Sequence, residues 1–335
     1  MTQPIASPGV TRQPIERNLA MELVRVTEAG AMAAAQHMGM GNKELVDQAA
    51  VDAMRFTLDG ISMDGVVVIG EGEKDEAPML YNGERIGDGT PPGVDIAVDP
   101  IDGTTLLSKG LPGAISVIAM AGRGMMHVPE GVFYMDKIAV GPEAASVIDL
   151  DAPVADNLHA VARALGRKIS EVTVIVLDRS RHQGLIEQIR ATGARIKLIS
   201  DGDVIAGIQA ALPNTSVDVL LGIGGAPEGV ITAAAIRCTG GAILCRAWPR
   251  TDEEREQLAE SGVDLARVYD TDELVGGEDV FFAATGASTG EVLDGVRFTA
   301  NGATTQSLVM RSRSGTLRWI ESVHDFTRLD KVRFK

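Results

Sequence analysis

Six acidic residues stand either just after a short apolar run of the sequence or on the apolar face of a helical pattern. They are Asp47, Glu71, Glu73, Asp99, Asp102 and Glu228. The group contains neither His nor Cys, which favours hard cations such as Mg²⁺ and Mn²⁺ because these prefer oxygen ligands. Two such ions about 3.5–4 Å apart can stabilise the entering and leaving oxygens of a phosphoryl transfer. The residue types therefore predict metal-assisted chemistry at a phosphate.

The sequence Asp-Pro-Ile-Asp-Gly-Thr-Thr at 99–105 is the point around which we expect these acids to gather. The apolar run 94–98 before it predicts a strand, and Pro100 is expected to end the hydrogen-bonded ladder at Asp99 because it lacks an N–H. The Asp-Gly step is typical of a turn, and either threonine could cap a following helix. By itself the stretch could be a simple polar turn.

The other acids favour a site over a turn. Asp47 lies on the apolar face of a helix predicted over 43–58, where a carboxylate needs a partner, although it could also interact only with the helix dipole. Glu71 and Glu73 follow a strand predicted over 65–69, and a solvated acidic loop is the alternative. Because both acidic clusters follow strands, where open α/β sheets bind ligands, we expect them to converge.

The elements that must position these residues alternate between strands and helices. A helix is expected over 16–38 and a charged helix over 252–260. Strands are predicted at 172–177, 195–199 and 217–221, each followed by a helix. This rhythm predicts an α/β fold with a largely parallel sheet layered by helices.

Two hairpins complete the expected organisation. One pairs 115–120 with 125–134 about the turn 122–124, and the other spans 304–323 about 312–315. The chain is expected to divide into a disordered tail at 1–15, a metal-binding half at 16–150 and a substrate-binding half at 151–335.

Composition limits the classes of function. Among 335 residues, 45% are hydrophobic and the net charge is −15, which argues against nucleic acid because phosphate backbones need a basic face. No apolar run approaches the ~18–20 residues that span a bilayer, and the N-terminus lacks a secretory pattern. Cys238 and Cys245 show no disulfide or zinc spacing. We therefore expect a soluble, cytoplasmic protein, in which metal ions or local bases must offset the acids before a phosphate can bind.

Several polar residues in the second half could contact such a substrate. Arg179, Arg181 and His182 lie between a strand and a helix N-terminus, a position suited to a phosphate, although they could be ordinary surface bases. Asp201 and Asp203 lack a basic context and could accept hydrogen bonds from sugar hydroxyls or act as helix caps.

A strand end at 134–137 and a glycine-rich segment at 222–225 each have two interpretations. Tyr134 and Lys137 could contact substrate or merely form a strand edge. The glycines at 222–225 weakly suggest dinucleotide binding, but the third glycine is misplaced and no acid lies between Glu228 and Asp252 to hold a ribose. We reject a dinucleotide site.

Three longer strings make the sequence recognisable. Asp-Pro-Ile-Asp-Gly-Thr with an upstream Gly-Glu-Gly-Glu resembles the signature of the lithium-sensitive, metal-dependent sugar and inositol phosphatases. The longer strings that begin at Arg17, Gly70 and Gly222 are more specific. They resemble bacterial class II fructose-1,6-bisphosphatase, and the resemblance runs from about Arg17 to His324.

The resemblance implies a layered α/β/α/β/α sandwich, two or more Mn²⁺ or Mg²⁺ ions, and hydrolysis of the 1-phosphate of fructose 1,6-bisphosphate, a step of gluconeogenesis. It implies metal binding by Asp47, Glu71, Asp99, Asp102 and Glu228. Thr104, Asp102 and Glu73 are the implied catalytic residues, with Thr104 either the nucleophile or the group that positions a water.

Substrate contacts implied by the resemblance are Gly103, Thr104, Tyr134, Arg179, Ser180, Arg181, Asp201, Gly202, Asp203 and Gly225. A homodimer or homotetramer is the implied assembly. Gln48, Gly113 and Ser180 depart from the family pattern, and Ser180 could loosen the phosphate loop. Sedoheptulose 1,7-bisphosphate or an inositol phosphate remains an alternative substrate, and a sugar-phosphate sensor without turnover remains the non-enzymatic alternative.

Overall fold

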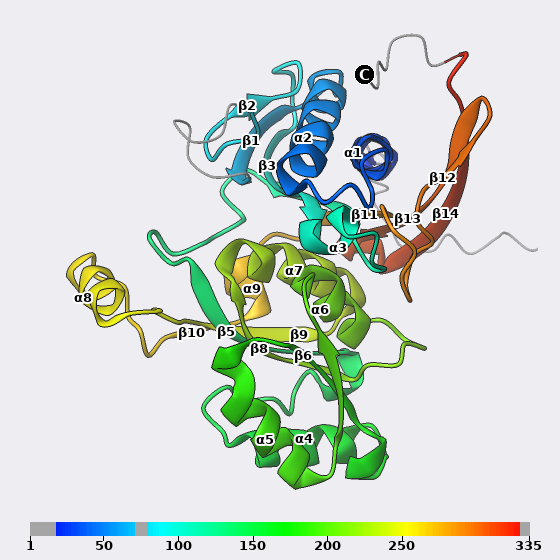
Figure 1. The fold of residues 1–335 in the computed structure, drawn as a ribbon. Coiled ribbons are helices and arrows are strands. Elements are labelled where there is room, and N and C mark those ends of the chain that lie inside the picture. The colour runs from blue at the N-terminus through cyan, green and yellow to red at the C-terminus, as the bar shows by residue number, and fades with distance from the viewer. Residues whose placement is uncertain (1–17, 71–78, 329–335) are drawn as a thin grey trace, which may run out of the picture.

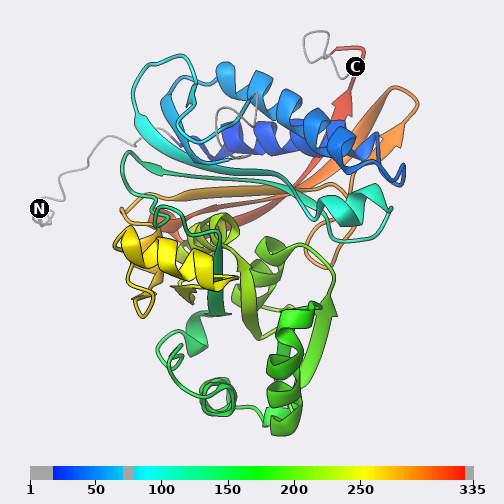
Figure 2. The ribbon, with the colours of Figure 1, turned by 60° about the vertical axis from the view of Figure 1, so that its left-hand side comes forward.

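The computed structural model describes residues 18–70 and 79–328 and shows a mixed α/β protein in five layers (Figure 1). A helical layer, a sheet, a second helical layer, a second sheet and a third helical layer follow one another, as the turned view also shows (Figure 2). The predicted α/β/α/β/α sandwich is therefore confirmed. The helices of the described segments include none that is long and apolar enough to cross a membrane.

The first sheet has the strand order β12-β13-β11-β4-β3-β1-β2, with β14 paired to β13. Its strands are β1 (Asp64–Ile69), β2 (Arg85–Ile86), β3 (Gly93–Asp102), β4 (Ile115–Gly122), β11 (Phe281–Gly286), β12 (Arg297–Thr299), β13 (Gly302–Arg311) and β14 (Thr316–Asp325). Helices α1 (Ala20–Ala35) and α2 (Lys43–Asp59) cover its outer face through a shared apolar core. The predicted C-terminal hairpin is confirmed as β13 and β14.

The second sheet has the order β10-β9-β5-β8-β6-β7. Its strands are β5 (Tyr134–Val140), β6 (Thr173–Leu177), β7 (Arg195–Ile199), β8 (Val219–Gly225), β9 (Ala242–Ala247) and β10 (Val268–Tyr269). Helices α4 (Val154–Ala164) and α5 (Gln183–Thr192) pack on its outer face, and α8 (Asp252–Glu260) projects at one end (Figure 1).

The central helical layer holds α6 (Asp203–Ala211), α7 (Ala226–Thr239) and the short α9 (Thr271–Leu274). Helix α7 is buried along almost its whole length because it lies between the two sheets, and its alanines allow both sheets to approach. The N-termini of α6 and α7 and the end of β3 meet on one side of this layer, where the candidate site lies.

Three predictions about the elements were wrong. β6 runs parallel to β7 and β8, but β5 runs antiparallel to β8 and β9, so the second sheet is mixed rather than largely parallel. β4 and β5 do not form a hairpin, because they belong to different sheets. The predicted boundary at residue 150 remains a prediction, although the first sheet takes strands from both sides of it.

The third wrong prediction is that the strand ends at Asp99, because β3 continues through Pro100 to Asp102. Pairing with the parallel neighbour β1 has already ended at Ala97, and the register with β4 shifts between Asp99 and Asp102. The missing N–H of Pro100 therefore falls in a bulge, where a ladder donor is not required.

Cys238 in α7 and Cys245 in β9 are free and buried, and burial raises the pKa of each thiol to about 12. We expect iodoacetamide at about pH 8 to leave the native protein unmodified, because the thiolate is the reactive form. Mass spectrometry should show two additions only after denaturation. Rapid alkylation of the native protein would contradict the burial.

Candidate active site

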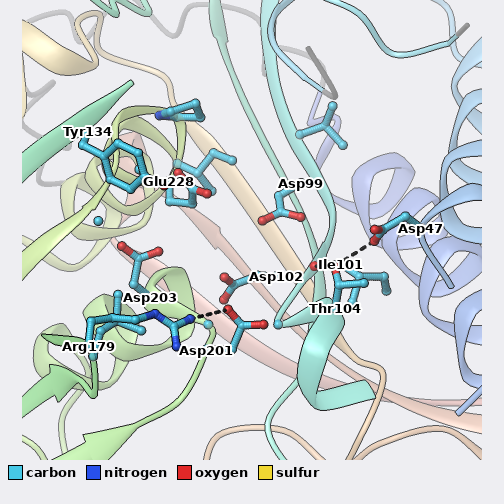
Figure 3. Close-up of a pocket in the computed structure, with 18 of the residues that line it drawn as sticks. Asp47, Asp99, Ile101, Asp102, Thr104, Tyr134, Arg179, Asp201, Asp203 and Glu228 are labelled. Carbon is cyan, nitrogen blue, oxygen red and sulfur yellow. Dashed lines mark hydrogen bonds and ion pairs between the residues drawn. The ribbon is translucent and has the colours of Figure 1, made fainter. Parts of the chain in front are cut away.

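A pocket of about 420 Å³ lies where β3, α3 (Thr104–Ser108), β5, β8 and the N-termini of α6 and α7 meet. Most predicted site residues line it, although they come from distant parts of the sequence (Figure 3). They are Asp47, Asp99, Asp102, Gly103, Thr104, Tyr134, Arg179, Arg181, Asp201, Gly202, Asp203, Gly225 and Glu228. Such a volume suits a small-molecule ligand.

The bulge in β3 explains why two acids three residues apart face the same pocket. Ile96 and Val98 pack towards α1 and α2, so alternation turns Ala97 and Asp99 towards the central layer. Without a bulge, Asp102 would point the opposite way from Asp99. The register shift between them re-aims Asp102, and both side chains reach the pocket (Figure 3).

Asp102 is 4% exposed and connects β3 to α6. Its Oδ2 accepts a hydrogen bond from the backbone N–H of Ile205 at 3.1 Å, in the first turn of α6. Burial, followed by the nearby charge of Asp203, raises the pKa of Asp102 well above its usual value. The strand end therefore both anchors a helix and presents an acid to the pocket.

Thr104 begins α3 and faces Asp47 from α2. Its hydroxyl lies 2.8 Å from Asp47 Oδ1 and 3.0 Å from the carbonyl oxygen of Ile101, so its single proton is shared between two acceptors. Burial raises the pKa of Asp47, while the hydrogen bond from Thr104 acts in the opposite direction. The partner that the sequence demanded for Asp47 is thus Thr104, and the predicted helix capping by a threonine is wrong because Gly103 is the N-cap.

Glu228 lies in the first turn of α7 and folds back over Gly225, where a Cβ would stand 1.8 Å from its Oε2. This buried oxygen has no hydrogen-bond partner among the described residues. Burial raises the pKa of Glu228, and the charge of Asp203 adds to this. An orphaned carboxylate oxygen near Asp99 and Asp102 fits an oxygen-preferring divalent cation.

Glu71 and Glu73, the other acids predicted to bind metal or to act in catalysis, lie outside the described residues. Within 18–70 and 79–328, the acids form no compact group of three with the geometry to hold a metal ion. The carboxylate donors of the pocket suit Mg²⁺ or Mn²⁺ in kind, since such ions usually complete their coordination with water and substrate phosphate.

Two basic residues face the acids across the pocket. Arg179 forms an ion pair with Asp201 at 3.7 Å, and Asp201 also accepts a hydrogen bond from the N–H of Thr105 at 3.1 Å. Arg181 donates to the carbonyl oxygen of Ile223 at 2.8 Å, and its guanidinium carbon lies 5.3 Å from the centre of the Tyr134 ring. Arg179 and Arg181 are therefore the cationic side chains that line the pocket, and Arg179 is paired there with an acid.

Ser180, near these basic residues, lies outside the pocket lining, and two interpretations of His182 and of the paired acids need correction. Ser180 does not line the pocket and is exposed, so the departure there does not alter a lining residue. His182 is not a phosphate ligand: its Nε2 accepts from the N–H of Ile223 at 2.8 Å, and its Nδ1 therefore donates to the carbonyl of Leu177 at 2.7 Å. Asp201 and Asp203 do not lack a basic context, because Arg179 and Lys137 pair with them.

Sequence reasoning left Lys137 open and gave no role to Arg250, which stands beside the lining residue Tyr134. Lys137 is buried in β5 and pairs with Asp203 at 2.7 Å. Arg250 lies 5.3 Å from the centre of the Tyr134 ring and is held by Glu254 at 2.7 Å. A lysine within an apolar strand was the only available signal for the first, and nothing in the sequence marked the second.

Comparison with known proteins gives consistent matches. Residues 17–324 match the family described as bacterial fructose-1,6-bisphosphatase, glpX-encoded. D-fructose 1,6-bisphosphatase class 2/sedoheptulose 1,7-bisphosphatase of Synechococcus sp. (strain JA-3-3Ab) is 43% identical over 92% of this chain and 96% of its own. Fructose-1,6-bisphosphatase 1 class 2 of Escherichia coli (strain K12) is 43% identical over 94% and 98%. The solved inositol monophosphatase from Anabaena (Nostoc) sp. PCC 7120 is 9% identical over 77% and 90%, with a TM-score of 0.37.

Proposed function

The chain belongs to the bacterial, glpX-encoded fructose-1,6-bisphosphatases, and from this premise we propose that it hydrolyses the 1-phosphate of fructose 1,6-bisphosphate to fructose 6-phosphate and phosphate. It is accordingly a phosphoric monoester hydrolase. The observation that carries this proposal is the meeting of Thr104 and six acids with Arg179 and Arg181 in one pocket. We place the enzyme in the cytoplasm and expect a homodimer or homotetramer.

The acids have a proposed role as ligands of Mn²⁺ or Mg²⁺. Asp47, Asp99, Asp102 and Glu228 would hold two or more such ions together with Glu71. When bound, divalent cations polarise the phosphoryl oxygens and offset the charge of the leaving alkoxide. The orphaned Oε2 of Glu228 supports this assignment, because a buried carboxylate oxygen without a partner is costly.

The chain's own groups would complete the reaction. Thr104 either attacks the phosphorus or orients the attacking water, and Asp102 or Glu73 would accept the proton. Tyr134, Arg179, Ser180 and Arg181 remain proposed substrate contacts, with Ser180 the weakest of them because it does not line the pocket. The remaining proposed substrate contacts are Gly103, Asp201, Gly202, Asp203 and Gly225.

A phosphate-release assay tests the proposal. We expect turnover of fructose 1,6-bisphosphate with Mn²⁺ or Mg²⁺ and none after addition of a chelator. Sedoheptulose 1,7-bisphosphate is the second candidate, because the Synechococcus relative carries both activities in its name. Inositol monophosphate should be a poor substrate. Ligand-induced thermal stabilisation without phosphate release would instead indicate a sensor.

Metal affinity should depend on pH. Burial raises the pKa values of Asp102 and Glu228, so part of each carboxyl stays protonated above its usual range, and a bound cation must displace those protons. Affinity for Mn²⁺ should therefore fall as pH falls through these raised values. Isothermal titration over a series of pH values, in buffers of different ionisation enthalpy, should show weaker binding and more proton release as the pH falls. Equal affinity without proton release would contradict the assignment.

A further inference from the structure

Lys137 is a buried cation that the proposed reaction does not use. It lies in the middle of β5 and is 1% exposed. Its Nζ donates to Asp203 Oδ2 at 2.7 Å and to the carbonyl oxygen of Gly225 at 2.8 Å. Asp203 begins α6 and Gly225 is the N-cap of α7, so one ammonium group ties together the starts of two of the helices that present residues to the pocket.

Gly224, which precedes this N-cap, leaves no room for a side chain beside the ion pair. A Cβ on Gly224 would stand 1.8 Å from Asp203 Oδ2 and 2.8 Å from Lys137 Nζ. Any side chain at 224 would therefore displace the carboxylate from the ammonium. β8 thus leaves space for the Lys137–Asp203 contact where it also lines the pocket.

A role in stability alone explains this arrangement poorly. Desolvating an ammonium and a carboxylate costs free energy that their attraction often only offsets, and apolar residues of similar volume usually stabilise a core as well. The contact instead orients the carboxylate of Asp203. It fixes which oxygen of Asp203 is occupied and leaves Oδ1 of a pocket-lining carboxylate for other donors.

We propose that Lys137 is a positioning residue, which holds Asp203 and the start of α7 in the geometry that binds the sugar hydroxyls of the substrate. This inference rests on the proposed function for the identity of the substrate. Lys137 acts through Asp203 and does not itself touch the reacting atoms. Its loss should therefore weaken substrate binding more than it slows the chemical step.

A double-mutant cycle tests the proposal with the metal-loaded full chain. Lys137→Met should raise KM for fructose 1,6-bisphosphate about 10- to 100-fold, the range expected when a hydrogen bond to a charged group is lost, with a smaller change in kcat. In an Asp203→Asn background, Lys137→Met should raise KM little further. Lys168→Met, at an exposed lysine beyond the second sheet, is the matched control. A KM within about twofold of wild type in folded Lys137→Met, or effects that multiply, would overturn the proposal.

Two additional measurements separate the possible failures. Gly224→Ala keeps every charge but displaces the contact, so it should raise KM as Lys137→Met does even if the latter folds poorly. Calorimetric binding of fructose 6-phosphate reads the same geometry without turnover. Weaker binding by both variants supports the role of Lys137 even if the wild type releases no phosphate, and that result would reject only the proposed function. Unchanged binding by both variants would reject the role of Lys137.

Discussion

Asp99→Ala is expected to abolish metal-dependent turnover. Asp99 is turned to the pocket by the alternation of β3 and lies beside Asp102 and Glu228 there. Lewis-acid stabilisation of a phosphoryl transition state is worth several kcal/mol, and each 1.4 kcal/mol changes a rate about tenfold. Loss of this proposed ligand should therefore lower kcat about 10³-fold or more in the phosphate-release assay.

The control for this variant is an acid with no route to the pocket. Asp156 is exposed in the first turn of α4, on the outer face of the second sheet, and Asp156→Ala should leave kcat unchanged. Both purified proteins should melt cooperatively, so that a folding defect is recognised. Substantial activity of folded Asp99→Ala with Mn²⁺ would sink the assignment of the site.

The fold was predictable where its signals are local. The helix 43–58 and the three strand–helix units of the second half were found because apolar periodicity and turn residues lie within each element. The false hairpin shows the limit of such signals. The turn after β4 exists, but residues 125–133 cross to the other sheet, and their strand-type pairing is limited to one isolated bridge between Met126 and Val275. Buried apolar residues indicate a strand without indicating its sheet.

The candidate site could be predicted for those residues whose type and position directly after a strand marked them. Asp99 and Asp102 were identified together, although the sequence did not reveal the bulge that turns both inward. The role of Lys137 could not be found, because it depends on α6 and β8 meeting β5 across long sequence separations. His182 was misassigned for the same reason, since its two backbone partners are set by tertiary packing.

Thr104 offers the second large effect, and two replacements separate its hydroxyl from its shape. Thr104→Val keeps the branched side chain but removes the group that hydrogen bonds to Asp47 and Ile101. We expect kcat to fall about 10²- to 10⁴-fold, the range in which a positioned proton-transfer or nucleophilic group contributes. Thr104→Ser keeps the hydroxyl and should retain kcat within about tenfold, because only a methyl group is lost.

The same pair of variants bears on how Thr104 acts. If its hydroxyl attacks phosphorus, acid-quenched single turnovers of the wild type should contain phosphothreonine at 104, and Thr104→Ser should yield phosphoserine there. If it orients a water, no covalent adduct forms, and a substrate chiral at phosphorus should react with inversion, whereas the two displacements through phosphothreonine should give retention. The hydrogen bond to Asp47 serves either route, since a carboxylate that accepts the Thr104 proton fixes the direction of the hydroxyl lone pairs. Full activity of Thr104→Val would exclude both routes, because neither can proceed without the hydroxyl of Thr104.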